Sequence, residues 1–375
     1  MADSTFDIVV IGGGIAGVSA ACELAGAGER VLLVEREGQL AYHTTGRSAA
    51  LFIEGWGPPT VRRLLTASRA GLESAPDRLG TPELLTLRPS LFVAEEADAA
   101  DVAALLVEVP ELDDIGPDGA LDMCPQLRPG VIAAAALQPR SCSIDVMALH
   151  QGYVRGVIGH GGQIEKWYDV VGIDRHAAAG FTVTSESGRS VSAGRVVLAA
   201  GAWTDILGAR AGAQPLGLAP LRRSMAVCPT PVVVEPFGPH VSDINDKYYW
   251  QPEGPNIQCS PADETPSEPC DARPEEIDIA YVLDQVNATT TLNLRSVKTS
   301  WAGLRTFSPD REPVCGEDPD VAGLWWFCGQ GGYGIETCEA MAASIAGLMT
   351  VGELPDEVRA HGIAAADLSA SRFRV

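Results

Sequence analysis

Three glycines near the start of the chain have the spacing that binds the pyrophosphate of a dinucleotide. Gly12, Gly14 and Gly17 form the pattern Gly-x-Gly-x-x-Gly. Gly12 permits a tight turn, Gly14 lets a pyrophosphate approach the backbone, and Gly17 lets a helix pack closely on a strand. Glu35 follows later, where a carboxylate accepts hydrogen bonds from ribose hydroxyls and disfavours a 2′-phosphate. The spacing therefore favours FAD or NAD over NADP.

The elements around these residues have the order that such a site requires. Phe6 to Ile11 is a short, mostly apolar run typical of a buried parallel strand. An Ala-rich stretch then predicts a helix to about Gly28, and a second strand is predicted from Arg30 to Glu35. Phosphates bind at the positive end of such a helix. A glycine-rich turn without a ligand is the alternative, but this order of elements favours a Rossmann-like α/β fold.

Length, charge and cysteine content narrow the class of protein. With 375 residues the chain exceeds one usual hydrophobic core, which predicts two domains or one elaborated domain. The net charge of -22 opposes nucleic-acid and anionic-membrane partners. The acidic first residues do not resemble a secretory signal, and no apolar run approaches the roughly 20 residues of a membrane span. The cysteines form no Cys-x-x-Cys pair. We therefore expect a cytoplasmic protein without a metal site.

Three later segments resemble the D-amino-acid-oxidase-like flavoproteins. Residues 42–50 (Tyr-His-Thr-Thr-Gly-Arg-Ser-Ala-Ala) resemble the segment that, in this family, passes between the pyrophosphate and the isoalloxazine. Residues 195–203 resemble the late strand and turn that close the nucleotide domain. Residues 324–335 resemble the strand, glycine loop and helix start beside the flavin ring. The segments lie in the family's order, and the resemblance implies FAD as the cofactor.

The resemblance also implies which residues contact FAD. A helix that begins near Ile335 would direct its N–H groups and dipole toward the flavin edge where negative charge builds up on reduction. Glu336 either lies near the ring or favours the positive end of that helix. The expected cofactor-binding residues are Gly12, Gly14, Ile15, Ala16, Gly17, Glu35, Arg36, His43, Thr44, Thr45, Arg47, Ser48, Ala49, Ala50, Val170, Gly201, Trp203, Gly331, Gly332, Tyr333, Gly334, Ile335 and Glu336.

The family pattern implies two interleaved domains. The FAD-binding domain would comprise residues 1–85, 130–215 and 300–375, and a mostly antiparallel substrate domain would comprise residues 86–129 and 216–299.

Within the expected substrate domain, the residue pattern supports this division. Leu221 to Cys228 and Lys247 to Gln251 are predicted strands, Pro252 to Pro274 is a predicted loop, and Glu275 to Gln285 is a predicted short helix.

In such an enzyme, oxidation of an amino acid moves a hydride from Cα to flavin N5, and the protein supplies positioning and charge. Arginine holds a carboxylate best, because its planar fork makes two parallel hydrogen bonds. By resemblance, Arg223 and Arg305 form this clamp and the Tyr249 hydroxyl adds a third contact. Arg222 should point the other way, because side chains alternate along a strand.

No histidine is needed as a base, because the substrate amine can lose its proton to water before hydride transfer. His43 would then position the flavin, while His150 and His160 would be structural or exposed. We expect FAD without a covalent bond, since the position of the attachment cysteine in the sarcosine-oxidase branch falls on or near Gly303. Cys315 and Cys328 resemble small apolar fillers.

Residues 149–153, 301–305 and 330–334 resemble the D-arginine dehydrogenase subgroup, but the expected substrate pocket departs from it. The subgroup's guanidinium-binding glutamate falls on Ser90, and Leu51, Ile53 and Trp56 make the wall apolar. A D-amino acid with a neutral side chain is therefore expected. The expected substrate-binding residues are Leu51, Ile53, Trp56, Ser90 and Gly332.

Several alternatives stay open. Glu54 could supply the missing carboxylate from a new position. The chain could instead oxidise an N-methyl amino acid or a 2-hydroxy acid, although the latter needs a base and His43 alone suggests itself. A non-catalytic FAD-binding module is opposed by the paired arginines, and a nucleic-acid-modifying flavoprotein by the acidic charge. The electron acceptor, and with it the choice between oxidase and dehydrogenase, is not identified by these residues.

Overall fold

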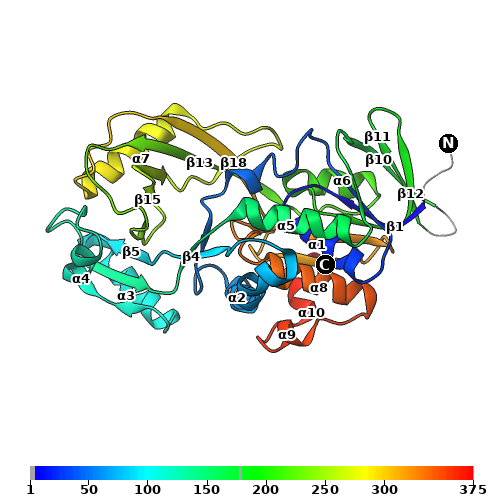
Figure 1. The fold of residues 1–375 in the computed structure, drawn as a ribbon, viewed down its shortest axis with the longest axis horizontal. Coiled ribbons are helices and arrows are strands. Elements are labelled where there is room, and N and C mark those ends of the chain that lie inside the picture. Colours follow the sequence, from blue (N-terminus) through cyan, green and yellow to red (C-terminus); the bar gives the residue numbers. More distant parts are fainter. Residues whose placement is uncertain (1–4, 177–179, 375) are drawn as a thin grey trace.

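The structure is a computed structural model that describes residues 5–176 and 180–374. The chain forms two lobes that lie side by side, and both chain ends lie in the lobe that contains β1 (Thr5–Ile11) (Figure 1). An eight-stranded sheet forms the centre of this first lobe, and a ten-stranded sheet forms the second.

The first sheet is parallel at its centre, because β1 pairs in parallel with both of its neighbours. Its order is β10 (Val170–Arg175), β11 (Phe181–Ser185), β12 (Ser190–Leu198), β1, β2 (Val31–Val34) and β9 (Gln163–Glu165), and β20 (Leu324–Cys328) pairs with β12 and with β19 (Val314–Glu317). Both faces of β1 are buried: Ile8 and Val10 pack in one apolar cluster, and Val9 and Ile11 in another. A parallel strand covered on both faces requires such a continuous apolar run.

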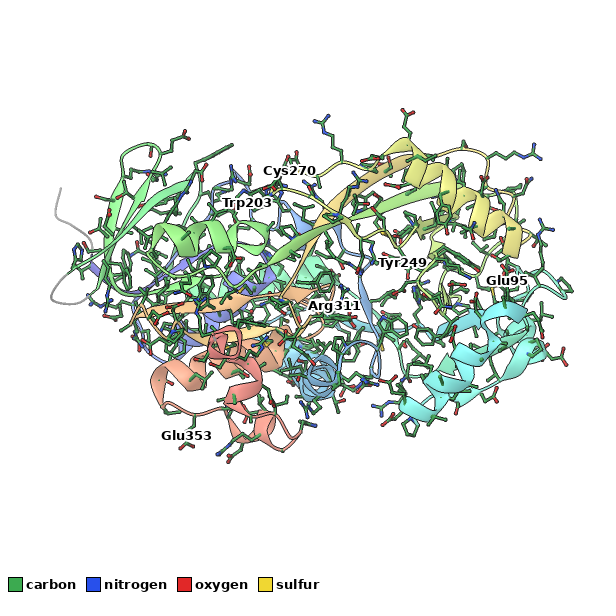
Figure 2. The ribbon with its side chains drawn as sticks, turned by 180° about the vertical axis from the view of Figure 1, so that it is seen from behind. Glu95, Trp203, Tyr249, Cys270, Arg311 and Glu353 are labelled. Carbon is green, nitrogen blue, oxygen red and sulfur yellow. The ribbon has the colours of Figure 1, made fainter. Side chains whose placement is uncertain are left out.

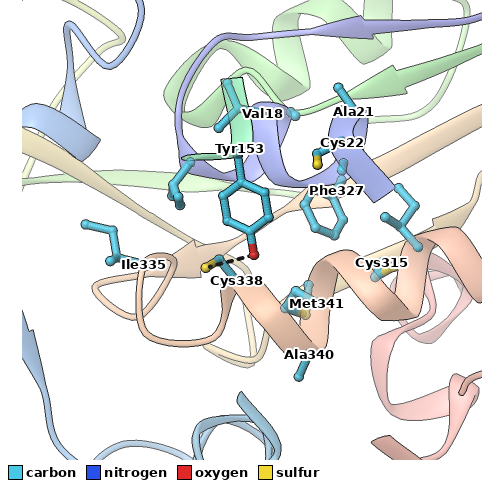
Figure 3. Packing of buried hydrophobic residues seen from close by; sticks show 14 of the residues in the cluster. Val18, Ala21, Cys22, Tyr153, Cys315, Phe327, Ile335, Cys338, Ala340 and Met341 are labelled. Carbon is cyan, nitrogen blue, oxygen red and sulfur yellow. Dashed lines mark hydrogen bonds between the residues drawn. The ribbon is translucent and has the colours of Figure 1, made fainter. Parts of the chain in front are cut away.

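Helices cover one face of this sheet. Helix α1 (Ile15–Gly26) packs against α5 (Val146–Gly159) and α8 (Cys338–Thr350), and α2 (Pro59–Leu79) packs against α8. Tyr153 of α5 is fully buried between α1 and α8, with its hydroxyl near the Cys338 sulfur (Figure 3). The remaining helices of this lobe are α6 (Thr204–Arg210), α9 (Asp356–Arg359) and α10 (Ala365–Leu368). None of the described helices combines the length and apolarity needed to cross a membrane.

The second sheet is mostly antiparallel. Its order is β21 (Gln330–Gly331), β18 (Thr299–Phe307), β13 (Ala219–Pro229), β16 (Asn256–Ser260), β15 (Tyr249–Glu253), β14 (His240–Asp243), β5 (Ser90–Ala94), β7 (Ala134–Gln138) and β6 (Asp113–Asp114), and β17 (Thr265–Pro266) pairs with β13. The helices of this lobe are α3 (Ala99–Glu108), α4 (Gly116–Met123) and α7 (Glu276–Thr289). A small sheet has the order β3 (Leu51–Phe52), β8 (Cys142–Ile144) and β4 (Leu85–Leu87).

The structure corrects several sequence expectations. The segment expected to be a loop after Gln251 contains β16 and β17, and β16 is held by pairing with β13 and β15. Strand β7, expected in the first lobe, pairs with β5 in the second sheet. Helix α8 begins at Cys338 and not near Ile335, because a hydrogen-bonded turn from the Tyr333 carbonyl to the Thr337 N–H comes first (3.0 Å).

Candidate active site

One cavity of about 570 Å³ extends from the turn between β1 and α1 to the second sheet. Gly12 to Ala16 and Glu35 line it in the first lobe, and Arg223, Tyr249 and Arg305 line it on the second sheet. In Figure 2, Trp203 lies over the first lobe, whereas Tyr249 and Arg311 lie where the two lobes meet. Residues of both lobes therefore line one continuous space, with the glycine turn in the first lobe and the arginines on the second sheet.

The three glycines of the first turn have different surroundings. A Cβ on Gly12 would lie 2.3 Å from the Ala199 carbonyl oxygen, and one on Gly17 would lie 1.8 Å from the Gly12 carbonyl oxygen. Both glycines are therefore required by backbone packing. At Gly14, among the described residues beyond its chain neighbours, a Cβ would meet only the Thr45 hydroxyl within 4 Å, at 3.2 Å. Gly14 thus faces the cavity, as a backbone that approaches a pyrophosphate must.

Two side chains hold this turn in place. The Gly13 N–H donates to Glu35 Oε2 at 2.6 Å, and the Ile15 N–H donates to Thr45 Oγ1 at 3.0 Å. The Glu35 carboxylate is buried, which raises its pKa, although the N–H groups of Glu37 and Gly13 oppose this shift. Glu35 therefore fixes the turn and still faces the cavity, where its remaining lone pairs can accept from ribose hydroxyls.

Flat groups gather beyond Glu35, at the end expected to hold adenosine. The Arg36 guanidinium lies 4.9 Å from the centre of the Trp203 ring, and Val170 lines the same part of the cavity. His43 packs against Trp203 with 4.8 Å between ring centres, and its Nε2 lies 3.1 Å from Glu37 Oε1. His43 is therefore engaged with neighbours on this side of the cavity.

The segment from His43 to Ala50 is tied to β18. The Thr44 hydroxyl donates to the Leu304 carbonyl oxygen at 2.7 Å, and the Trp301 indole N–H donates to the Arg47 carbonyl oxygen at 3.0 Å. The Arg47 guanidinium donates to the Ala302 carbonyl oxygen at 2.8 Å and pairs with Asp271 at 2.5 Å. Arg47 therefore lines the cavity, but its guanidinium N–H groups donate to other residues of the protein.

The substrate end carries two arginines on one face of the second sheet. Leu221 pairs with Arg305 and Arg223 pairs with Gly303, so Arg223 and Arg305 are diagonal neighbours on adjacent strands. Burial lowers the pKa of Arg223, and the positive charge of Arg305 lowers it further. Arg222 points to the other face, as predicted, where it pairs with Glu275 and Asp278. Two guanidinium groups that face one cavity favour an anion between them.

Other polar groups at this end were missed by the sequence interpretation. Glu264 Oε1 lies 3.3 Å from Arg223 and 2.8 Å from Arg311. Asp246 occupies a left-handed turn conformation (φ 53°) and feels the charges of Arg223 and Arg305, although burial raises its pKa. His240 is buried beside Tyr249, and burial lowers its pKa to about 3. Asp246 lies on the turn before Tyr249, His240 on β14 and Glu264 after β16, and no local sequence pattern marks any of the three.

The clamp has a third predicted member and a close backbone neighbour. The Tyr249 hydroxyl donates to the Met225 sulfur at 3.2 Å, and the Arg223 guanidinium lies 5.9 Å from the Tyr249 ring centre. Arg305 lies across Gly332, where a Cβ would be 2.9 Å from the guanidinium carbon. Gly332 therefore leaves the space that the Arg305 side chain fills.

An apolar wall faces this polar end. Leu51, Ile53 and Trp56 line the cavity, and Trp56 stacks on Phe92 with 4.9 Å between ring centres. Glu54, the expected rival acid, bonds Arg69 Nε at 2.6 Å and does not line the cavity.

Most of the predicted residues meet in this cavity, but three do not line it. Ser90 is fully buried in β5, so its expected contact with substrate is not supported. Gly17 acts in the packing of α1 on β1, and Ala50 lies behind the cavity wall, next to a second cavity. The predicted residues that line the main cavity are Gly12, Gly14, Ile15, Ala16, Glu35, Arg36, His43, Thr44, Thr45, Arg47, Ser48, Ala49, Leu51, Ile53, Trp56, Val170, Gly201, Trp203, Arg223, Tyr249, Arg305, Gly331, Gly332, Tyr333, Gly334, Ile335 and Glu336.

The arrangement fits FAD. The open glycine turn at the start of α1, the acid at the end of β2 and the aromatic end near Trp203 suit the adenosine diphosphate half. The glycine loop before α8 leaves room for a flat ring, with the arginine pair beyond it. Over the residues that the structure describes, no cysteine lines this cavity and no group of His, Cys, Asp or Glu side chains could hold a metal ion.

Comparison with known proteins places this geometry in a family. The family model "FAD dependent oxidoreductase" matches residues 7–348. Among solved structures, L-proline dehydrogenase from P. horikoshii is 20% identical with a TM-score of 0.84, over 99% of this chain and 98% of that one. Glycine oxidase from Geobacillus kaustophilus is 21% identical with a TM-score of 0.79, over 94% and 99%. L-α-glycerophosphate oxidase from Mycoplasma pneumoniae, with FAD bound, is 18% identical with a TM-score of 0.82, over 92% and 95%. This chain therefore belongs to the FAD-dependent oxidoreductase family.

Proposed function

We propose that this protein oxidises an amino acid at its Cα–N bond, with the substrate carboxylate held by Arg223 and Arg305. The observation that carries the proposal is the diagonal pair of arginines, Arg223 buried and Arg305 partly exposed, that lines the cavity that fits FAD. Arg223 is only 7% exposed, and it faces a second positive charge. In the described part of the chain, Arg305 has no acidic partner of its own; Glu264 pairs with Arg223 and Arg311 instead. A carboxylate would relieve this repulsion and use the fork geometry of both side chains.

A neutral substrate side chain suits the opposite wall. Leu51, Ile53, Trp56 and Phe92 offer apolar and aromatic surface. The acid nearest to them in sequence, Glu54, is neutralised by Arg69. These four residues themselves offer no charged partner to a cationic side chain, which makes its burial against them costly. We therefore propose D-amino acids with neutral side chains, the D-configuration resting on the resemblance to D-arginine dehydrogenase.

FAD, when bound, supplies the acceptor for the hydride that leaves Cα. The protein's own part is to fix the substrate between the arginine pair and the apolar wall, and to exclude water from that space. We propose that FAD is held without a covalent bond. Cys315 and Cys328 are fully buried in the first lobe, and burial raises the pKa of both thiols. Denaturation by acid or heat should release intact FAD; colour that stays with the precipitate would contradict the proposal.

Oxidation of an N-methyl amino acid remains the nearest rival, because the same arginine pair would serve it. A 2-hydroxy acid is less suited, because a hydroxyl needs a base. His43 is engaged by Glu37, and His240 has a pKa too low to accept a proton well. The glycerophosphate oxidase relative nevertheless shows that this fold serves hydroxyl substrates in other proteins.

The test is anaerobic bleaching of the purified yellow protein. A panel of D-amino acids, L-amino acids, N-methyl amino acids and 2-hydroxy acids is mixed with the enzyme, and loss of flavin absorbance is followed. Fastest bleaching by neutral D-amino acids is the expected result. Bleaching by hydroxy acids alone would overturn the proposal. Fastest bleaching by N-methyl or L-amino acids would overturn the assignment of neutral D-amino acids as substrates.

A further inference from the structure

Glu336 is an acid inside the cavity whose role the arginine pair does not explain. It follows the glycine loop that precedes α8 and is only partly exposed, toward the cavity. Its Oε2 accepts the Ile53 N–H at 2.8 Å, which ties the glycine loop to the apolar wall. Its other oxygen accepts no hydrogen bond from the residues that the structure describes. One oxygen is therefore tethered, and the other is free for a ligand.

The charges around Glu336 come from a small set of neighbours. Arg305, on β18, is the cation whose field reaches the Glu336 carboxylate. Tyr333, on the same loop as Glu336, feels both the Arg305 charge and the Glu336 charge. Glu54, next to Ile53, pairs with Arg69 and does not line the cavity. Glu336 is thus placed close to one member of the carboxylate clamp and beside the wall that would hold the substrate side chain.

This placement matches the shape of an α-amino acid. Its carboxylate, its side chain and its nitrogen are all attached to Cα. If Arg305 holds the carboxylate and the wall at Ile53 holds the side chain, an acceptor is still needed for the nitrogen. An ammonium group that enters a water-poor cavity without an acceptor carries a large desolvation cost. Glu336 is bonded to Ile53 through one oxygen and feels the charge of Arg305, so its other oxygen can serve as that acceptor.

We propose that Glu336 binds the substrate amine and accepts its proton, so that the substrate reacts as the neutral amine. This inference rests on the proposed function. In the step, the N–H bond of the substrate ammonium breaks, an O–H bond forms at the Glu336 carboxylate, and no electrons leave either molecule. The carboxylate clamp and Glu336 would together recognise the zwitterion that an amino acid presents in water.

The proton affinity of Glu336 suits this task. Burial raises its pKa to about 8, while the Ile53 N–H and Arg305 act in the opposite direction. A glutamate with its ordinary pKa of 4.5 would be too weak a base to take a proton from an ammonium group. Near pH 8 about half of the Glu336 carboxyl groups are ionised and able to accept a proton, and the ionised form is a stronger base than an ordinary carboxylate.

The test compares Glu336→Gln with Glu336→Ala in the FAD-loaded enzyme. Glutamine keeps an oxygen for the Ile53 N–H and removes the base, whereas alanine removes both. With D-phenylalanine at a pH above 8, where the wild-type Glu336 is mostly ionised, Glu336→Gln should lose roughly 100-fold or more in kcat/KM. Its binding of 3-phenylpropanoate, which lacks the amine, should be unchanged or tighter, as measured by the shift in flavin absorbance. Arg305→Met should weaken the binding of both compounds.

The pH dependence separates a base from a structural tether. In the wild type, binding of 3-phenylpropanoate should weaken as the pH rises through about 8, because the ionised Glu336 repels the carboxylate. In Glu336→Gln this dependence should disappear. The inference is overturned if Glu336→Gln keeps the wild-type kcat/KM and pH profile, or if the loss appears only in Glu336→Ala. If no amino acid bleaches the wild type, both this inference and the proposed function are overturned. If amino acids bleach the wild type and Glu336→Gln equally, only this inference is overturned.

Discussion

The Thr44 hydroxyl donates a 2.7 Å hydrogen bond to the carbonyl oxygen of Leu304, the residue directly before Arg305. A residue expected to contact the cofactor is thereby joined to the strand that carries Arg305, a member of the proposed carboxylate clamp. Thr44→Val removes the donor and leaves a partly buried carbonyl without its partner. The expected loss of binding free energy is about 1–2 kcal/mol, which corresponds to a roughly 5- to 30-fold change in the binding or rate constant. It should appear both as weaker FAD binding and as a lower kcat/KM.

Thr350→Val is the matched control for Thr44→Val, because the Thr350 hydroxyl bonds a helix carbonyl at the surface (2.7 Å). It should change neither quantity. A Thr44→Val enzyme that loses FAD affinity while its kcat/KM at saturating FAD stays normal would show that the two ends of the cavity are independent.

Substitution of Gly14 and of Gly17 by a larger residue should have different effects on folding and on FAD binding. Gly14→Val should fold and lose FAD, because the new side chain enters the cavity. Gly17→Val should not fold, because its Cβ would lie 1.8 Å from the Gly12 carbonyl oxygen. Circular dichroism and bound flavin absorbance distinguish the two outcomes. Gly159→Ala, where nothing lies within 4 Å of the new Cβ, should preserve both signals; a yellow Gly14→Val protein would contradict the assignment.

Substitution of Arg223 or Arg305 should reduce kcat/KM far more than substitution of Arg222, the neighbour of Arg223 on β13. Arg305→Met or Arg223→Met should remove about 2–5 kcal/mol of binding, or roughly 30- to 4000-fold in kcat/KM. Arg222→Met should leave kcat/KM nearly unchanged, because Arg222 pairs with Glu275 and Asp278 on the opposite face. Near-normal kinetics in all three variants would place the carboxylate site elsewhere.

Substrate preference should follow the apolar wall. D-Methionine, D-leucine and D-phenylalanine should exceed D-arginine and D-lysine in kcat/KM, because burial of apolar surface contributes about 25 cal/mol per Å². Asp246 is the acid that would reverse this order, since it lines the cavity near the arginines. A preference for the cationic pair that disappears in Asp246→Asn, and persists in Glu54→Gln, would refute the neutral assignment.

Local signals in the sequence predicted much of this molecule. The glycine turn, the strands around it and the opposite orientations of Arg222 and Arg223 depend on short-range spacing and on strand alternation. Strand β16 was missed because Asn256 to Ser260 has little apolar alternation and depends on partners far away in sequence. Ser90 was misplaced because alignment to a relative fixes a position in a strand but not the distance from that strand to the cavity.

Cavity residues that belong to no sequence motif were the hardest to predict. Asp246 and His240 reach the cavity through the turn and strand that precede Tyr249, and no local pattern marks them. The free oxygen of Glu336 became apparent only with its tether to Ile53, a contact between residues 283 positions apart. Such groups depend on the tertiary arrangement, which a spacing rule cannot supply.

Strand β18 limits how this enzyme can diversify. Its carbonyl groups accept hydrogen bonds from Thr44 and Arg47, and its Arg305 side chain lines the cavity as a member of the proposed carboxylate clamp. A shift in the register of β18 would move both the segment with Thr44 and Arg47 and the Arg305 side chain. Neither can therefore be repositioned alone by a register shift of this strand. New specificities in a mutant library should therefore arise from the wall at Leu51 to Trp56 and from the turn that carries Asp246, whereas insertions or deletions in β18 should be eliminated by selection.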